Sequence, residues 1–213
     1  MLMVSSLLMP SISSFPSLFR LLRLRRLFLS ILLLLGATAS TARAAVDESV
    51  WALLKKGGNI ILLRHAQTEP GIGDPAGFTL GRCETQRKLS AQGRADAAAL
   101  GAQFRARAIP LDAVFSSRWC RALDTATLAF GRVTPAPMLD SMFKDRIDSD
   151  DSAKRDALFD TLAARRGSGN VVLVTHAVNI AALTGVSPAS GEMIVTRLAG
   201  PRMLVVIGRG APD

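Results

Sequence analysis

The sequence predicts an α/β fold, a three-layer α/β/α sandwich with a largely parallel central sheet. Continuous apolar runs at 59–63 and 171–174 are typical of central strands that are buried on both faces. Helix-like stretches alternate with strand-like runs along residues 45–213, and this order is typical of a parallel sheet covered by helices on both sides.

The first half of this region has clear element boundaries. Residues 66–89, after the first apolar run, are rich in Gly, Pro, Thr and Arg and predict an irregular loop. A helix begins after Ser90, a favourable N-cap, and ends before Pro110. A short strand at 112–115 and a helix at 118–130, closed by a glycine, are expected next.

The second half begins with a proline-containing loop and an acid-rich stretch at 140–151. Gly167 marks the end of a helix, and Gly185 marks the end of a short helical piece. The expected elements are a helix at 152–166, the buried strand at 171–174, a helical piece at 180–183, and closing strands at 194–198 and 203–207.

Charge is concentrated at the beginning of the chain. The net charge is +9, but residues 1–44 hold five of the 26 basic residues and no acid, which leaves 21 basic against 17 acidic residues. After residue 44 no Lys/Arg block is longer than two, so the clustered charge of a nucleic-acid-binding surface is missing. A few arginines placed for a small anionic substrate fit this distribution better.

Residues 1–44 predict a cleaved signal peptide, with the functional domain at 45–213. A basic cluster ending in Arg25-Arg26 precedes an apolar run at 27–35, and Ala42-Arg43-Ala44 is an A-x-A cleavage site. Both the general secretory route and the twin-arginine route fit, and an uncleaved signal anchor is the alternative. We therefore expect a periplasmic or otherwise exported protein, in contact with the membrane only through this segment.

The two cysteines, Cys83 and Cys120, both lie in the domain. In an oxidising compartment they are candidates for a disulfide, while two unpaired thiols are the alternative. Two cysteines and two histidines at scattered spacing do not form a zinc signature.

The only two histidines follow the two buried runs, in Arg64-His65-Ala66 and Thr175-His176-Ala177. Ligands of open α/β sheets bind beyond the carboxyl ends of the strands, so both imidazoles are expected at one site. A neutral imidazole is a nucleophile for phosphoryl transfer, and the planar guanidinium of an arginine matches phosphoryl oxygens. Arg64 stands beside His65, and Arg121 lies at the start of the helix that follows the short strand at 112–115.

Four segments resemble the motifs of the histidine phosphatase superfamily, the phosphoglycerate-mutase-like group, in the same order. The resemblance spans about residues 59–207 and extends to small exported phosphatases, including those of lipopolysaccharide core heptose. The segments are Leu63-Arg64-His65-Ala66-Gln67-Thr68, Leu89-Ser90-Ala91-Gln92-Gly93-Arg94-Ala95, the run from Ser116 to Ala126, and Val174-Thr175-His176.

The resemblance implies an exported phosphomonoesterase in which His65 forms a phosphohistidine that water then hydrolyses. It implies that Arg64, Arg121 and His176 bind the phosphoryl oxygens, with Thr68 near the phosphate. It implies no metal and no organic cofactor, and a small-molecule or glycan phosphate as the substrate, with no nucleic-acid partner.

The proton donor departs from the family pattern, because Leu139-Asp140-Ser141 has serine where many members have glutamate. Asp140, Asp145 and Asp148 are the nearby acids, and Asp145 is preferred because an apolar residue and another arginine flank it.

The serine at this position leaves a non-enzymatic function as the alternative. A non-catalytic phospho-ligand-binding module on the same fold would keep the arginines and lose the acid. Arg82 and Arg87 in the loop are candidates for reading the substrate, although loop arginines more often face solvent.

Overall fold

The structure is a computed structural model that describes residues 47–71, 73–142 and 151–211. The predicted signal peptide, and two of the three candidate proton donors, Asp145 and Asp148, lie outside these residues. Among the described helices, none has the length and apolar character needed to cross a membrane.

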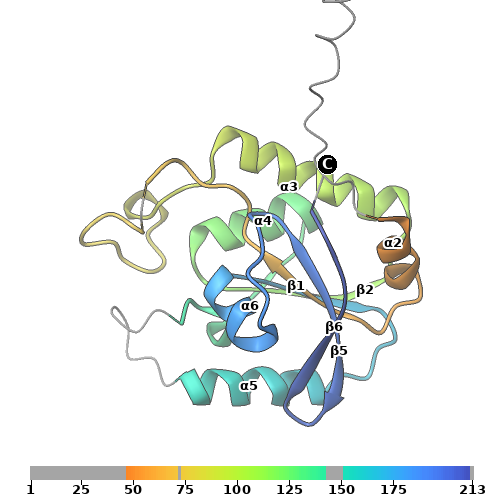
Figure 1. The fold of residues 1–213 in the computed structure, drawn as a ribbon. Coiled ribbons are helices and arrows are strands. Elements are labelled where there is room, and N and C mark those ends of the chain that lie inside the picture. Colours follow the sequence, from red (N-terminus) through yellow and green to blue (C-terminus); the bar gives the residue numbers. More distant parts are fainter. Residues whose placement is uncertain (1–46, 72, 143–150, 212–213) are drawn as a thin grey trace, which may run out of the picture. The chain divides into compact units, whose positions relative to one another are not determined.

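A six-stranded sheet forms the centre of the described domain, in the order β3-β2-β4-β1-β5-β6 (Figure 1). Strands β3, β2, β4 and β1 pair in parallel, and β5 joins β1 antiparallel and continues as a hairpin into β6. The strands are β1 (Ile60–Arg64), β2 (Leu111–Ser116), β3 (Thr134–Pro135), β4 (Asn170–Thr175), β5 (Met193–Gly200) and β6 (Met203–Gly210).

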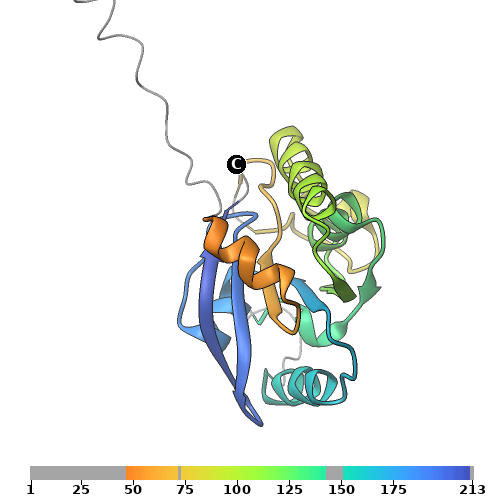
Figure 2. The same ribbon diagram turned by 90° about the vertical axis from the view of Figure 1, so that its right-hand side faces the viewer.

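Helices cover both faces of this sheet, and Figures 1 and 2 show α3 and α5 on opposite sides. The buried side chains of α2, α3 and α4 pack on one face and those of α5 and α6 on the other. The helices are α2 (Glu48–Lys55), α3 (Ala91–Ala106), α4 (Cys120–Phe130), α5 (Asp151–Ala163) and α6 (Ala177–Thr184), with 3₁₀ turns at Cys83–Thr85 and Pro137–Leu139.

Strand β1 shows why its apolar run is continuous. Ile61 and Leu63 belong to the core beneath α2, α3 and α4, whereas Ile60 and Leu62 belong to the core beneath α5 and α6. Since successive side chains of a strand point to opposite faces, a strand that is covered on both sides has no polar position. The predicted three-layer α/β fold with a largely parallel sheet is confirmed.

Element boundaries differ from the predictions by a few residues. Helix α4 begins at Cys120 rather than at 118, because Trp119 has the extended backbone of an N-cap. Helix α5 ends at Ala163, three residues before the expected end at 166. Ser90 caps α3 as expected, since its side chain accepts a hydrogen bond from Gly93 N.

Three neighbouring strands end at the same edge of the sheet. His65 follows β1, His176 follows β4 and Ser117 follows β2. Backbone hydrogen bonds continue the ladder past the strand ends, from His65 N to Thr175 O and from Ser117 N to Val174 O. The order β2-β4-β1 therefore brings three polar side chains to one place.

Candidate active site

His65 is buried at this edge with a defined orientation. The side chain is 5% exposed, and Nδ1 lies 2.9 Å from the carbonyl oxygen of Ala66. Because a carbonyl can only accept, Nδ1 carries the proton and Nε2 holds the lone pair of the neutral ring. Burial, opposed in part by this hydrogen bond and reinforced by Arg121, Arg64 and Arg87, lowers the pKa of His65 to about 3. His65 is therefore a neutral imidazole with a free lone pair on Nε2.

His176 is the neighbour of His65, with ring centres 5.4 Å apart. Its Nε2 lies 2.8 Å from the hydroxyl of Ser117, and the indole of Trp119 packs on the ring with centres 5.6 Å apart. Burial, followed by the electrostatic interaction with the His65 ring and with nearby arginines, holds the pKa of His176 well below its ordinary value.

Two guanidinium groups reach the site with unused donors. Arg64 donates from Nη1 to the carbonyl of Pro188, and its Nε is buried without a partner among the described residues. Arg121 is 6% exposed, and its Nε is likewise buried with no described partner. Burial and the charge of Arg87 lower the pKa of Arg64. Buried donors without partners cost free energy unless a ligand accepts from them, so these nitrogens fit an anion-binding site.

Arg121 is held in place by Asp74 of the long loop. Both carboxylate oxygens of Asp74 accept hydrogen bonds from Arg121 Nη1, at 2.9 and 3.1 Å, and Asp74 also accepts from Trp119 Nε1 and from the backbone N–H of Arg87. Burial alone would raise the pKa of Asp74, but Arg121 and the other donors hold it below its ordinary value. Asp74 is therefore a carboxylate that orients the guanidinium.

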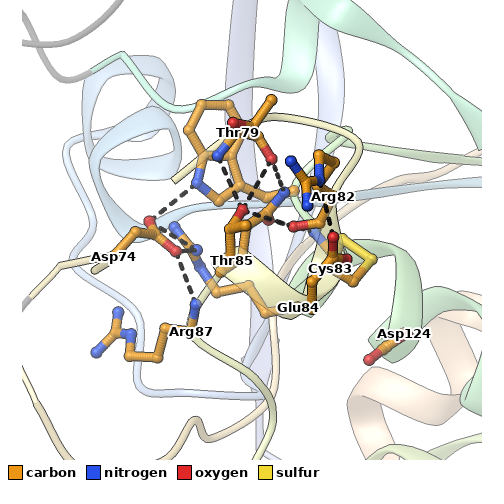
Figure 3. Close-up of a disulfide and its surroundings, with 12 residues drawn as sticks. Asp74, Thr79, Arg82, Cys83, Glu84, Thr85, Arg87 and Asp124 are labelled. Carbon is orange, nitrogen blue, oxygen red and sulfur yellow. Dashed lines mark hydrogen bonds and ion pairs between the residues drawn. A yellow bond between two sulfur atoms is a disulfide. The ribbon is translucent and has the colours of Figure 1, made fainter. Parts of the chain in front are cut away.

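The long loop is fastened to the start of α4, as Figure 3 shows around the disulfide. Cys83 and Cys120 form a disulfide with Cα atoms 5.5 Å apart, and Gln86 Oε1 accepts from Cys120 N. Of the two open alternatives for the cysteines, the structure thus has the bridged one. The loop carries Arg87, whose Nε is buried without a described partner, so Arg87 belongs to the rim of the site.

Two other predicted residues occupy different surroundings. Thr68 forms an isolated bridge with Leu89 at the base of the loop, and no side-chain hydrogen bond ties it to the histidines or arginines in the described part of the chain. Arg82 is exposed and pairs with Glu84, so the expectation that it faces solvent holds, whereas Arg87 is half-buried.

Asp140 is buried, and both of its carboxylate oxygens accept hydrogen bonds from neighbouring groups. Its Oδ1 accepts from the backbone N–H of Arg118 at 2.7 Å and from Ser117 Oγ at 3.2 Å, and its Oδ2 accepts from the Arg118 guanidinium. The carboxylate thus acts as a hydrogen-bond acceptor, an arrangement that disfavours it as the proton donor. The described residues include no group of three or more His, Cys, Asp or Glu side chains that could hold a metal ion.

Part of the chain matches a known protein family. Residues 60–146, which contain His65 and Arg121, match the family model of the histidine phosphatase superfamily, branch 1. This segment of the chain is similar to the histidine phosphatase superfamily. No curated protein matches the chain in sequence.

Solved structures with the same fold support the architecture. YhfR from Bacillus stearothermophilus is 17% identical with a TM-score of 0.52, and the match covers 73% of this chain and 98% of that one. The product of open reading frame Rv3214 from Mycobacterium tuberculosis is 17% identical with a TM-score of 0.51, covering 72% and 97%. A mutant phosphoserine phosphatase from Entamoeba histolytica, solved with phosphoserine, is 18% identical with a TM-score of 0.50, covering 71% and 96%.

Sequence reasoning missed four residues of this candidate site. Ser117 lies within a motif that was recognised, and its place directly after β2 was the available signal. Thr125, in the same motif, accepts from Ala66 N and donates to the carbonyl of Arg121, so it joins the residue after His65 to α4. Trp119 lies in the same motif and packs on His176. Asp74 carried no signal, because its contacts depend on how the irregular loop folds.

Proposed function

We propose that the protein is an exported phosphomonoesterase that hydrolyses a phosphate ester through a phosphohistidine on His65. The observation that carries the proposal is the hydrogen bond from His65 Nδ1 to the Ala66 carbonyl, because it leaves the lone pair on Nε2 in a ring that is neutral at physiological pH.

The charges around this nucleophile support a dianionic phosphoryl group as the ligand. Arg64, Arg87 and Arg121 carry three positive charges, of which Asp74 offsets one, and each guanidinium has a buried Nε without a described partner. The remaining two charges match the two negative charges of a phosphate monoester. Arg64, Arg121 and His176 bind the phosphoryl oxygens in this proposal, with Thr68 at the base of the adjoining loop.

The substrate in this proposal is a small-molecule or glycan phosphate. The phosphoserine bound to the Entamoeba protein is a small phosphate monoester on the same fold, which is compatible with this class. Asp145, the preferred proton donor, lies outside the described residues and stays a prediction.

Export of the protein is supported by the disulfide between Cys83 and Cys120, since disulfides persist mainly in oxidising compartments. We expect the protein isolated from its host to begin near Ala45, and mass spectrometry of its N-terminal peptide measures this. Full-length protein recovered with free thiols from the cytosol would contradict export.

The test of the activity is a rapid quench of the enzyme with labelled p-nitrophenyl phosphate, followed by assay of an acid-labile, base-stable phosphoenzyme. His65→Ala should abolish this species, and Arg121→Ala should slow its formation about 10²- to 10³-fold through loss of a transition-state donor. Arg82→Ala is the matched control, because Arg82 is an exposed arginine of the neighbouring loop. Unchanged phosphoenzyme formation by His65→Ala would refute the proposal, and tight phosphate binding without turnover would favour the binding-module alternative.

A further inference from the structure

A chain of hydrogen bonds leads from the buried carboxylate of Asp140 to His176. Asp140 Oδ1 lies 3.2 Å from Ser117 Oγ, and Ser117 Oγ lies 2.8 Å from His176 Nε2. All three side chains are buried, with Asp140 2% and His176 4% exposed. The backbone N–H of Trp119 also donates to Ser117 Oγ, at 3.3 Å.

The hydroxyl of Ser117 can satisfy its three neighbours in only one way. A hydroxyl has one proton and two lone pairs, and a carboxylate accepts only. If Ser117 donates to Asp140, it accepts from His176 Nε2–H and from Trp119 N–H, and every group is satisfied. If it donated to His176 instead, a lone pair of Oγ would face the carboxylate oxygen, which is repulsive. The satisfied arrangement places the proton of His176 on Nε2.

This arrangement gives the two histidines opposite protonation patterns. His65 carries its proton on Nδ1, bonded to the Ala66 carbonyl, and presents Nε2. His176 carries its proton on Nε2, and its Nδ1 makes no hydrogen bond with any residue of the described part of the chain. A second proton on His176 therefore enters at Nδ1, and the carboxylate of Asp140, acting through Ser117, favours the resulting cation.

We propose that His176, in place of Asp145, is the catalytic acid of this protein and that Asp140 and Ser117 are the residues that position it, an inference that rests on the proposed phosphohistidine mechanism. The neighbouring ring of His65, 5.4 Å away between centres, places the phosphoryl group directly beside His176. Binding of the phosphoryl dianion offsets the arginine charges that oppose a cation there, and His176 takes up a proton from solvent.

The two chemical steps then balance. In the first, the bond from His65 Nε2 to phosphorus forms, the bond from phosphorus to the ester oxygen breaks, and the Nδ1 proton of His176 moves to the leaving oxygen. In the second, a water oxygen bonds to phosphorus, the Nε2–phosphorus bond breaks, and the proton of that water returns to His176. No separate carboxylic acid is required, which accounts for a chain that has serine at the usual glutamate position.

The test compares two substrates that differ in their need for an acid. The leaving phenolate of p-nitrophenyl phosphate departs without a proton, whereas the alkoxide of glycerol phosphate needs one. Ser117→Ala and Asp140→Asn should lower kcat/KM for glycerol phosphate about 100-fold more than for p-nitrophenyl phosphate. Ser117→Thr, which keeps the hydroxyl, should restore the wild-type ratio of the two values.

Matched controls separate this role from a structural one. Arg118→Gln removes the guanidinium from Asp140 but keeps the backbone N–H and the Ser117 bond, so the substrate ratio should not change. An equal loss on both substrates in Ser117→Ala and Asp140→Asn would overturn the proposal, as would a shifted ratio in Asp145→Asn alone. Absence of turnover and of phosphoenzyme in the wild-type protein would instead refute the proposed function itself.

Discussion

At the scale of single residues, the site depends on which atom of each buried group holds the proton. His65 and His176 are the only histidines of the chain and are both buried beside arginines, yet their hydrogen-bond partners differ in kind. A backbone carbonyl fixes one ring, and a serine bonded to a carboxylate fixes the other. Two identical side chains thereby acquire different chemistry from their neighbours.

This difference predicts the nitrogen NMR spectrum of the protein. We expect His65 to show the Nδ1–H form and His176 the Nε2–H form, measured by long-range ¹⁵N–¹H correlation of ¹⁵N-histidine-labelled protein without phosphate. Because burial and the nearby arginines lower the pKa of His65 to about 3, its signals should stay those of a neutral ring at pH 5.

Ser117→Ala should change the signals of His176 and leave those of His65 in place. The variant also assigns the two sets of signals, since only His176 contacts Ser117. Two rings with the same form, or a His65 ring that titrates near pH 6.5, would contradict the prediction.

At the scale of elements, the disulfide and the loop base determine where the site arginines lie. The loop starts and ends at the bridge between Thr68 and Leu89, and Ser90 N donates to the carbonyl of Gln67 beside it. Its far part is tied to α4 through Cys83 and Cys120. Two attachment points on opposite sides of a long irregular loop give it a defined path, so that it can present charged groups to the site.

Replacement of both cysteines by serine should therefore loosen the loop as well as destabilise the domain. The bridge closes a segment of 37 residues, and the loop-entropy model gives a loss of about 4 kcal/mol in the free energy of unfolding. Urea unfolding of the wild-type protein and the variant measures this loss. We expect a rise in KM larger than the change in kcat, since Asp74 and Arg87 are held through the loop.

Treatment of the double variant with a reducing agent is the control, because only the wild-type protein has a bridge to lose. Reduced wild-type protein should match the variant in stability and in KM. A variant as stable as the oxidised wild-type protein would show that the bridge contributes nothing to folding.

The sequence predicted the strands and the two histidines better than the loop. Apolar runs such as 59–63 record burial directly, and a histidine directly after such a run lies at the strand end whatever the loops do. The contacts of Asp74 with Arg121 join residues 47 positions apart across an irregular segment. No hydrophobic periodicity in the sequence predicts such a contact, because the contact depends on the path of the loop. For the same reason the sequence leaves open whether Cys83 and Cys120 form a disulfide or stay free thiols.

At the scale of the whole molecule, burial of two neutral histidines makes the stability of the fold depend on pH. The unfolded chain binds a proton at His65 below an ordinary pKa of about 6.5, while the folded protein does not bind it until about pH 3. Between these values the unfolded state holds more protons, so stability is full above about pH 6.5 and falls as the pH is lowered toward 3. His176, with its lowered pKa, adds to the effect with the same sign.

His65→Gln should reduce this dependence. Each such histidine contributes a slope of about 1.4 kcal/mol per pH unit, and glutamine removes one of them while keeping a polar side chain. Urea unfolding of both proteins between pH 7.5 and pH 4 gives the two slopes. Equal slopes would show that His65 takes up its proton in the folded state at an ordinary pH.

The pairing of β6 has a practical consequence for attaching the protein to a surface. Gly210 at the end of β6 pairs with Met193, which in turn pairs with Leu63, two residues before His65. A bead or chip coupled at the end of β6 would therefore sit beside the edge that carries the histidines and hinder the access of bulky ligands. Coupling through a cysteine introduced at Pro110, in the turn before β2 at the opposite edge, would leave the histidines open to such ligands.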